Sequence, residues 1–185
     1  MNRDIQMKIK NKLGVLALVC TFFYTGLALA SITTDIYQLN ADGEKKGIGE
    51  KIGTITFLDS ENGLEIKTNL EKLPPGEHGF HIHENAVCDG SMKDDKWVSG
   101  LAAGGHLDPN HSGHHLGPQG QGHLGDLPVL TADDKGVSKQ TLVAKRLKLE
   151  NIKDRSVVIH QGPDNYSDEP PMGGGGDRIA CGVIK

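Results

Sequence analysis

The stretch of sequence that decides the fold is GEKIGTITFLDSENGLEIKTNL, residues 49–70. Two runs in which apolar and polar residues alternate, residues 49–58 and 63–70, flank a polar connection at residues 59–63. Alternation with a period of two is typical of strands that bury one face, and a short connection containing Gly and Asn is typical of a hairpin. This stretch therefore predicts two strands joined by a turn.

Similar signals lie on both sides of this pair. Short apolar or β-branched runs, separated by clusters of turn-forming residues, occur at residues 32–39, 78–84, 129–132, 137–144, 156–160 and 179–184. No convincing amphipathic helix accompanies these runs. The pattern predicts an all-β protein, an eight-stranded antiparallel Greek-key sandwich or barrel.

Two long stretches, residues 85–127 and 161–177, carry no strand signal. The first is rich in Gly, His and Pro, and the second contains Pro170-Pro171 and a run of glycines at residues 173–176. A long irregular stretch inside a compact domain is usually functional. We expect a long metal-binding loop in the first and a loop over the active site in the second, although a glycine run alone is equally typical of a linker.

The histidines are grouped in a way that core packing does not require, although any single one is most simply a packed or solvated residue. His81 and His83 are two apart on a predicted strand, so both side chains point to one face and can bind one ion. His160 ends another predicted strand and can supply a third nitrogen. A carboxylate beside histidines, such as Asp126, favours zinc, whereas an all-nitrogen set suits copper. The sequence therefore predicts two metals.

The first thirty residues have the pattern of a secretory signal peptide. Four Lys or Arg residues precede an apolar run at residues 13–29, and ALAS at residues 28–31 is a small-residue cleavage pattern. The apolar run is short for a retained membrane anchor, which is the rival interpretation. We expect residues 1–30 to be removed and residues 31–185 to form a single domain.

Removal of the leader changes both the cysteine count and the charge. Cys20 lies within the leader, so Cys88 and Cys181 remain, and an even pair in an exported protein predicts one disulfide. The leader holds four basic residues and one acidic residue, so its loss changes the formal net charge from −4 to −7. An acidic chain without a basic run argues against nucleic acid or an anionic membrane as a partner.

Motifs dispersed along the chain resemble those of copper, zinc superoxide dismutases. They are HGFHIHE at residues 78–84, GGH at 104–106, HLGD at 123–126, VVIHQGPDN at 157–165 and GGGGDRIACGVIK at 173–185. The bacterial periplasmic branch is most similar, and the resemblance covers essentially all of the predicted domain. It implies an enzyme in the periplasm that converts superoxide to oxygen and hydrogen peroxide, with one copper and one zinc ion per subunit.

The resemblance also implies the ligands of both ions. The implied copper ligands are His81, His83, His106 and His160. The implied zinc ligands are His106, His115, His123 and Asp126, so that His106 bridges the two metals and supplies a proton during catalysis. His115 is implied rather than His114 because it directly precedes Leu-Gly-Pro. His111 and His114 are then surplus histidines of the loop.

Three further residues are implied to support the site. Asp164 resembles the aspartate that accepts hydrogen bonds from one copper histidine and one zinc histidine. Arg178 resembles the arginine that stands over the copper and guides the anion, although an arginine just before a terminal strand can also be a surface ion-pair residue. His78 lies outside the ligand set, and we expect it to make a structural hydrogen bond.

The loop at residues 161–177 departs from the eukaryotic pattern because it contains no lysine. Outer positive charge must then come from elsewhere, and Lys93 and Lys96 are candidates. Ordinary solvated lysines beside Asp94 and Asp95 are an equally good interpretation.

Other functions fit parts of the sequence. A metal buffer on the same fold would use His111 and His114, but it has no need of Arg178. An exported adhesion sandwich would carry incidental histidines, and a ligand shared between two metals, as implied for His106, argues against it. The sequence leaves a homodimer open: Trp97 either marks a dimer contact or caps its loop against the sandwich.

Overall fold

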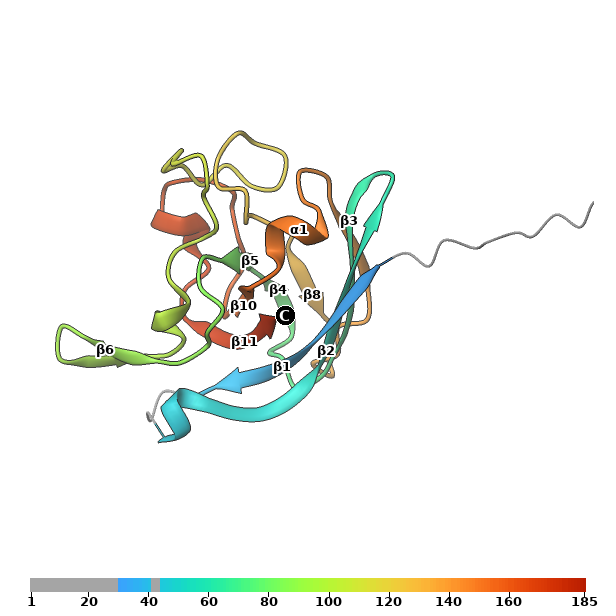
Figure 1. The fold of residues 1–185 in the computed structure, drawn as a ribbon. Coiled ribbons are helices and arrows are strands. Elements are labelled where there is room, and N and C mark those ends of the chain that lie inside the picture. Colours follow the sequence, from blue (N-terminus) through green and yellow to red (C-terminus); the bar gives the residue numbers. More distant parts are fainter. Residues whose placement is uncertain (1–29, 41–43) are drawn as a thin grey trace, which may run out of the picture.

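The computed structural model describes residues 30–40 and 44–185, and its strands curl into an open half-barrel (Figure 1). The predicted signal peptide, apart from Ala30, lies outside the described residues. One antiparallel sheet has the strand order β5-β10-β11-β1-β2-β3-β9. These strands are β5 (Phe80–His83), β10 (Arg155–His160), β11 (Arg178–Ile184), β1 (Ser31–Leu39), β2 (Ile48–Ser60), β3 (Gly63–Leu70) and β9 (Thr141–Ala144).

Two smaller sheets and four short helical turns complete the described fold. β4 (Gly76–His78) pairs with β8 (Leu130–Ala132), and β6 (Ser91–Lys93) pairs with β7 (Lys96–Val98). The helical turns are η1 (Glu44–Gly47), η2 (Leu101–Ala103), α1 (Leu149–Ile152) and η3 (Pro171–Gly174). Within the described ranges, no helix is both long and apolar enough to span a bilayer.

The two strands predicted at residues 49–70 are confirmed, and they form a hairpin. β2 and β3 pair from Gly53↔Leu70 to Ser60↔Gly63, with the turn between them. Ile55 and Phe57 alternate with half-buried threonines and are fully buried. Burying a side chain of this size contributes roughly 1.5–3 kcal/mol, so the alternation fixes which face of the pair meets the core.

The connectivity agrees with the expected class. β1, β2 and β3 follow one another as neighbours, and the last strand, β11, returns to lie antiparallel to β1. A late strand that closes beside the first of a consecutive series is a Greek-key arrangement. The all-β prediction is therefore confirmed.

The predicted strand count is wrong in detail. The run at residues 78–84 is interrupted at Gly79, where the chain leaves its partner β8 and β5 takes β10 as its partner. The run at residues 137–144 is ordered as a strand only from Thr141. The hairpin β6–β7 was not predicted, because its sequence SMKDDKWV is polar and shows no apolar alternation.

The predicted disulfide is present. Cys88 and Cys181 are bonded with a sequence separation of 93 residues. Both cysteines are buried and pack with Ala103 and Val158 in a small apolar cluster. The bond ties the segment that follows β5 to β11, and so joins the long loop at residues 85–127 to the sheet.

Candidate metal centre

The first histidine pair is positioned by β5, which is buried along its whole length. Ile82 belongs to the main apolar core, so His81 and His83 on either side of it face the opposite way. β5 pairs with β10 in the register Ser156↔His83 and Val158↔His81. His160, at the end of β10, follows a register shift that lies between Ile159 and His160.

The histidines His81, His83, His106 and His160 converge as the sequence predicts. One nitrogen from each lies within 4.8 Å of the others, and all four side chains are buried. His81 Nδ1, His83 Nε2 and His160 Nε2 have no hydrogen-bond partner. Because unpartnered buried polar atoms are rare, three of them at one point indicate a ligand such as a metal ion.

Burial controls the protonation of this group. Desolvation, followed by the charge of neighbouring His106, holds the pKa of His81 and His83 well below the usual value. Desolvation also lowers the pKa of His160 to about 4. The rings are therefore neutral at physiological pH, which is the form that binds a metal.

His106 is brought to this group by the long loop. An isolated antiparallel bridge joins it to His83, and its ring centroid lies 3.9 Å from that of His81. Its Nδ1 lies 3.1 Å from Asp126 Oδ1. His106 therefore stands between the four-histidine group and a second group around Asp126, as expected for a bridging ligand.

The second group surrounds the carboxylate of Asp126. The Nδ1 atoms of His115 and His123 lie 3.0 and 3.5 Å from Asp126 Oδ1, and neither nitrogen makes a hydrogen bond. Burial raises the pKa of Asp126, but the three histidines around the carboxylate outweigh burial and lower it. Burial lowers the pKa of His115, but Asp126 and Asp164 outweigh burial and raise this pKa to about 9.

Geometry alone allows another fourth member for this group. The ligand atoms of His81, His106, His115 and Asp126 also lie within 4.8 Å of one another. His81, however, has one nitrogen in the four-histidine group and the other 2.6 Å from Asp164 Oδ2. His123, with a free Nδ1 beside Asp126, fits the zinc set better.

Asp164 connects the two groups, as the resemblance implies. Its Oδ2 lies 2.6 Å from His81 Nε2, and its Oδ1 lies 2.8 Å from His115 Nε2. Burial raises the pKa of this carboxyl, but hydrogen bonds from His115 and His81 outweigh burial and lower it. An ionised carboxylate here fixes the orientation of both rings.

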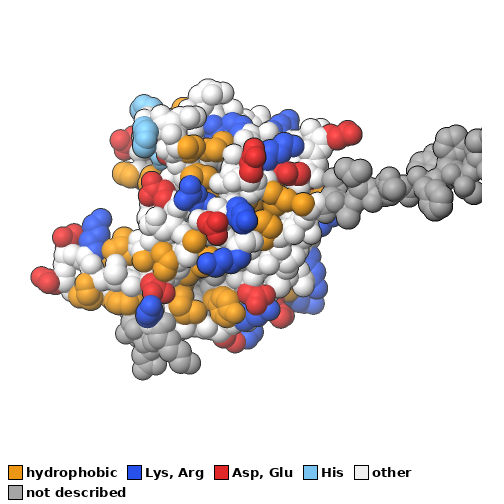
Figure 2. Space-filling view, viewed as in Figure 1, with side chains coloured by type: hydrophobic (Ala, Val, Ile, Leu, Met, Phe, Trp, Pro, Cys, Tyr) orange, Lys and Arg blue, Asp and Glu red, His pale blue; other side chains and the backbone are white. Residues whose placement is uncertain are grey.

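The surplus histidines are exposed. The His114 side chain is 65% exposed, and its Nδ1 lies 2.8 Å from Asp168 Oδ2. His111 is exposed as well. Histidine atoms reach the face shown in Figure 2 in one small area, where the surrounding acidic and basic side chains are interspersed.

The loop at residues 161–177 packs onto the histidines, so the linker interpretation of its glycines is wrong. The loop is held by backbone hydrogen bonds, from Asn165 N to Gly173 O and from Gly162 N to Gly175 O. Gly173 has a φ of +75°, and a Cβ there would lie 2.0 Å from Asp164 Oδ1 and 2.6 Å from His115 Nε2. Only glycine permits this approach.

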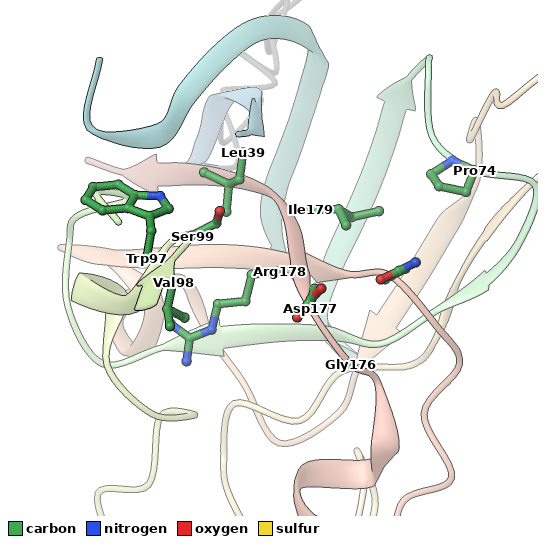
Figure 3. Close-up of a pocket in the computed structure, with 10 residues that line it drawn as sticks. Leu39, Pro74, Trp97, Val98, Ser99, Gly176, Asp177, Arg178 and Ile179 are labelled. Carbon is green, nitrogen blue, oxygen red and sulfur yellow. The ribbon is translucent and has the colours of Figure 1, made fainter. Parts of the chain in front are cut away.

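Arg178 reaches from the start of β11 towards the segment that contains Val98 (Figure 3). It donates hydrogen bonds to the carbonyl oxygens of Gly100, at 2.5 Å, and Gly104, at 2.7 Å. His83 Nδ1 lies 3.0 Å from the same Gly104 oxygen. Arg178 therefore braces the loop that leads to His106 as well as bringing a positive charge.

A cavity of about 420 Å³ opens beside Arg178. Figure 3 shows the apolar side chains of Leu39, Trp97 and Ile179 on its walls. Among the described residues that line it, none belongs to either histidine group. The cavity is thus separate from the candidate metal centre.

The other residues singled out from the sequence lie away from the two groups or support them. His78 has Nδ1 2.8 Å from the carbonyl oxygen of His160 and Nε2 2.8 Å from that of Pro74, a structural position as expected. Lys93 and Lys96 face each other across the β6–β7 hairpin, which projects from the barrel in Figure 1. Trp97 is half-buried, and its ring packs against Gly47 and Gly90.

Three supporting residues were not predicted from the sequence. Asp168 Oδ1 accepts a hydrogen bond from the backbone N–H of His115 at 2.7 Å. Arg146 donates to the carbonyl oxygens of Gly122 and His123. Glu84 Oε2 accepts from Gly105 N at 3.0 Å. Each is an ordinary charged residue whose partner is distant in sequence, so no local pattern identifies it.

An antiparallel half-barrel that holds an all-histidine group beside a histidine–aspartate group defines a protein with two adjoining transition-metal sites. The model of the copper/zinc superoxide dismutase family matches residues 51–184. The chain belongs to the copper/zinc superoxide dismutase family, oxidoreductases that use copper and zinc to dismutate superoxide.

Relatives from Gram-negative bacteria match over most of their length. The chain is 49% identical over 172 residues to superoxide dismutase [Cu-Zn] 2 of Salmonella typhimurium, which covers 92% of this chain and 97% of the relative. It is 55% identical over 141 residues to the Brucella abortus enzyme, which covers 75% and 82%. These similarities confirm the resemblance to the bacterial enzymes.

Solved structures agree with the fold. The Cu/Zn superoxide dismutase from Brucella abortus superposes with a TM-score of 0.81 at 51% identity and covers 84% of this chain and all of its own. The monomeric copper, zinc superoxide dismutase from Salmonella enterica superposes with a TM-score of 0.75 at 50% identity, with the same coverage.

Proposed function

We propose that each metal of this superoxide dismutase is held by the set of residues that the sequence predicts. Copper is held by His81, His83, His106 and His160. Zinc is held by His106, His115, His123 and Asp126. The assignment is supported by the buried histidine nitrogens that make no hydrogen bond. Three of them lie in the all-histidine group, and two lie beside Asp126.

The donors of each set suit the assigned ion. Four imidazole nitrogens without a carboxylate suit copper, whereas three imidazoles with one carboxylate make a closed site of the kind zinc occupies structurally. Asp164 supports both sets, because each of its oxygens accepts a hydrogen bond from a ring of one set. Its ionised form keeps His81 Nδ1 and His115 Nδ1 free for the metals.

Copper, when bound, supplies the one-electron oxidation and reduction by which two superoxide ions and two protons become oxygen and hydrogen peroxide. The protein must bring the anion in and deliver a proton. His106 is placed to hold that proton on Nε2, because its Nδ1 is directed to Asp126. The zinc ligands would hold an ion that orders the loop and keeps the ring of His106 in place.

Arg178 is proposed to guide the substrate. The domain at residues 31–185 has a formal charge of −7, so a small anion is repelled on average. A positive electrostatic potential close to the copper must then attract the anion locally. Burial lowers the pKa of Arg178 from its ordinary value, yet an arginine remains charged at neutral pH. Superoxide dismutases are themselves a standard example of electrostatic steering.

Export to the periplasm is part of the proposal. It is supported by the leader pattern at residues 1–30 and by the similarity to bacterial enzymes. The disulfide between Cys88 and Cys181 also suits an oxidising compartment. N-terminal sequencing of the protein from a periplasmic fraction tests this directly: the expected first residue is Ser31.

The homodimer stays a prediction. Packing of Trp97 against Gly47 and Gly90 supports its alternative role as a cap on the loop. The molar mass of the purified domain in solution, measured by light scattering, distinguishes a monomer from a homodimer.

The ligand assignment is tested by metal content and superoxide consumption together. His83→Ala should lose copper and activity but keep zinc, whereas His115→Ala should lose zinc. His114→Ala is the matched control for the second variant and should keep one zinc per chain. Loss of zinc from His114→Ala, with zinc retained in His115→Ala, would contradict the assignment.

A further inference from the structure

Two adjacent histidines compete for one inward position in the zinc loop. His115 is completely buried, whereas the neighbouring His114 side chain is 65% exposed. The two residues have the same chemistry and the same capacity to bind zinc. Something outside this pair must therefore decide which ring turns inward.

Asp168, on the other loop, contacts both histidines. Its Oδ1 accepts a hydrogen bond from the backbone N–H of His115 at 2.7 Å. Its Oδ2 lies 2.8 Å from His114 Nδ1, which donates to it. One carboxylate thus holds the His114 ring on the outside and the backbone of His115 in place.

The same loop also holds the inward ring of His115. Asp164, four residues before Asp168, lies 2.8 Å from His115 Nε2. The ring is therefore fixed at its far end by Asp164, and the backbone of the same residue is fixed by Asp168. The Nδ1 between these two attachments is left facing Asp126 at 3.0 Å.

The segment that carries Asp168 is itself held in shape. Ser167 N donates to Asn165 Oδ1 at 3.0 Å, and Glu169 N donates to Ser167 Oγ at 3.2 Å. Asn165 Nδ2 donates to the Glu169 carbonyl oxygen at 3.0 Å. Because these bonds close the turn on both sides of Asp168, its carboxylate has a defined position despite its exposure.

We propose that Asp168 is a positioning residue for the zinc site, which selects His115 over His114 as the ligand by holding one backbone and the other ring. The inference rests on the proposed zinc ligands. The exposed contact with His114 adds little to stability, since exposed ion pairs are weak, so its effect falls on the geometry of the site. Asp168 also links the zinc loop to the loop at residues 161–177, which packs on His160.

The test uses the copper-free protein with zinc or cobalt in the second site. In Asp168→Ala, zinc release to a competing chelator should be about 10–100-fold faster, the usual effect of losing an outer-shell partner, and the cobalt absorption bands should shift. Asp168→Asn keeps an acceptor for His115 N–H and should restore most of both properties. Glu169→Ala removes the same charge one residue away and should match the parent protein.

Equal zinc release and identical cobalt spectra for Asp168→Ala and Glu169→Ala would overturn the inference. His115→Ala distinguishes that failure from failure of the ligand set. If His115→Ala loses the cobalt bands while Asp168→Ala behaves like its control, the zinc ligand set is supported and the positioning role of Asp168 is wrong. If His115→Ala keeps the bands unchanged, the ligand set itself is wrong.

Discussion

The two halves of the metal centre are built from different parts of the fold. The proposed copper half takes His81, His83 and His160 from β5 and β10, paired strands at one end of the main sheet. The proposed zinc half takes His115 and His123 from an irregular loop, and its rings surround a carboxylate. Strand pairing orders the first half, whereas the second is held by Asp126, Asp164 and a few polar contacts.

The difference also appears in the protonation of the rings. Burial outweighs the charge of Asp164 and lowers the pKa of His160 to about 4, whereas Asp126 and Asp164 outweigh burial and raise the pKa of His115 to about 9. Without metal, the copper half therefore favours neutral rings and the zinc half favours a charged ring. We therefore expect the copper half to be preformed by the sheet and the zinc half to depend on its ion for order.

The largest effect is expected from a strand ligand. His83→Ala removes one of four copper nitrogens, so copper should be lost and activity should fall more than about a hundredfold. The zinc content and the melting temperature of the metal-free protein should hardly change, because β5 keeps its pairing. His111→Ala, at an exposed histidine of the loop, is the control, and a similar loss of activity there would contradict the division into two halves.

The disulfide offers a second test, because it ties the loop region to the sheet. A bond that closes a loop of 93 residues stabilises by about 4 to 5 kcal/mol in the chain-entropy model. Reduction should lower the free energy of unfolding by an amount of this order, measured by urea denaturation of the metal-free protein. Reduction should leave bound copper in place, and copper loss before unfolding would show that the copper half also needs the bond.

Acid and alkali should act on different halves of the metal-free protein. His160 has a folded pKa of about 4, below its unfolded value near 6.5, so its contribution is present above pH 6.5 and is lost as pH falls towards 4. The free energy of unfolding should fall by about 3 kcal/mol when this contribution is lost. His115 has a raised pKa, so its contribution is present below pH 6.5 and is lost as pH rises through about 9.

A series of denaturant titrations between pH 4 and 10 checks both signs. His160→Gln should make the acid side of the stability profile less steep, since His81 and His83 still contribute there, and should leave the alkaline side unchanged. His115→Gln should do the opposite. A profile that is unaffected by either change would show that these rings do not control the pH dependence.

Sequence patterns predicted most of the sheet because strand alternation reports burial locally. The strands β2, β3, β10 and β11 follow from their apolar runs, and the structure pairs β2 with β3 and β10 with β11. The break at Gly79 was not predictable, because it arises from a change of partner strand, and the β6–β7 hairpin has no apolar pattern. His81, His83 and Asp126 stand out as motifs, whereas Asp168 acts through residues 53 and 54 positions away and leaves no local trace.

Arg178 is the residue proposed to guide the anion to the copper half. Arg178→Ala should lower the second-order rate about tenfold and flatten its dependence on salt, because a steering charge is lost. The variant also loses the bonds to Gly100 and Gly104. Arg178→Lys keeps the charge without the fork of donors, so it should restore the salt dependence; an unchanged rate in Arg178→Ala at low salt would remove Arg178 as the guide.

The smallest effect is expected at the hairpin tip. Changing Lys93 and Lys96 together to Ser should reduce the rate less than about twofold, and only at low ionic strength, because exposed charges are screened within about 10 Å at 0.1 M salt. Lys135→Ser with Lys139→Ser, at exposed positions elsewhere, is the matched control. Identical salt profiles for the two double variants would exclude the hairpin lysines from steering.

Amide hydrogen exchange of the metal-free protein tests the central claim most directly. If the copper half is preformed, amides of β5 and β10 should exchange within about tenfold of their rates in the metal-loaded protein. Amides at residues 105–126 and 162–176 should exchange far faster than in the loaded protein and become protected when zinc alone is added. Equal loss of protection in the strands and the loops, or full protection of the loops without zinc, would contradict the account.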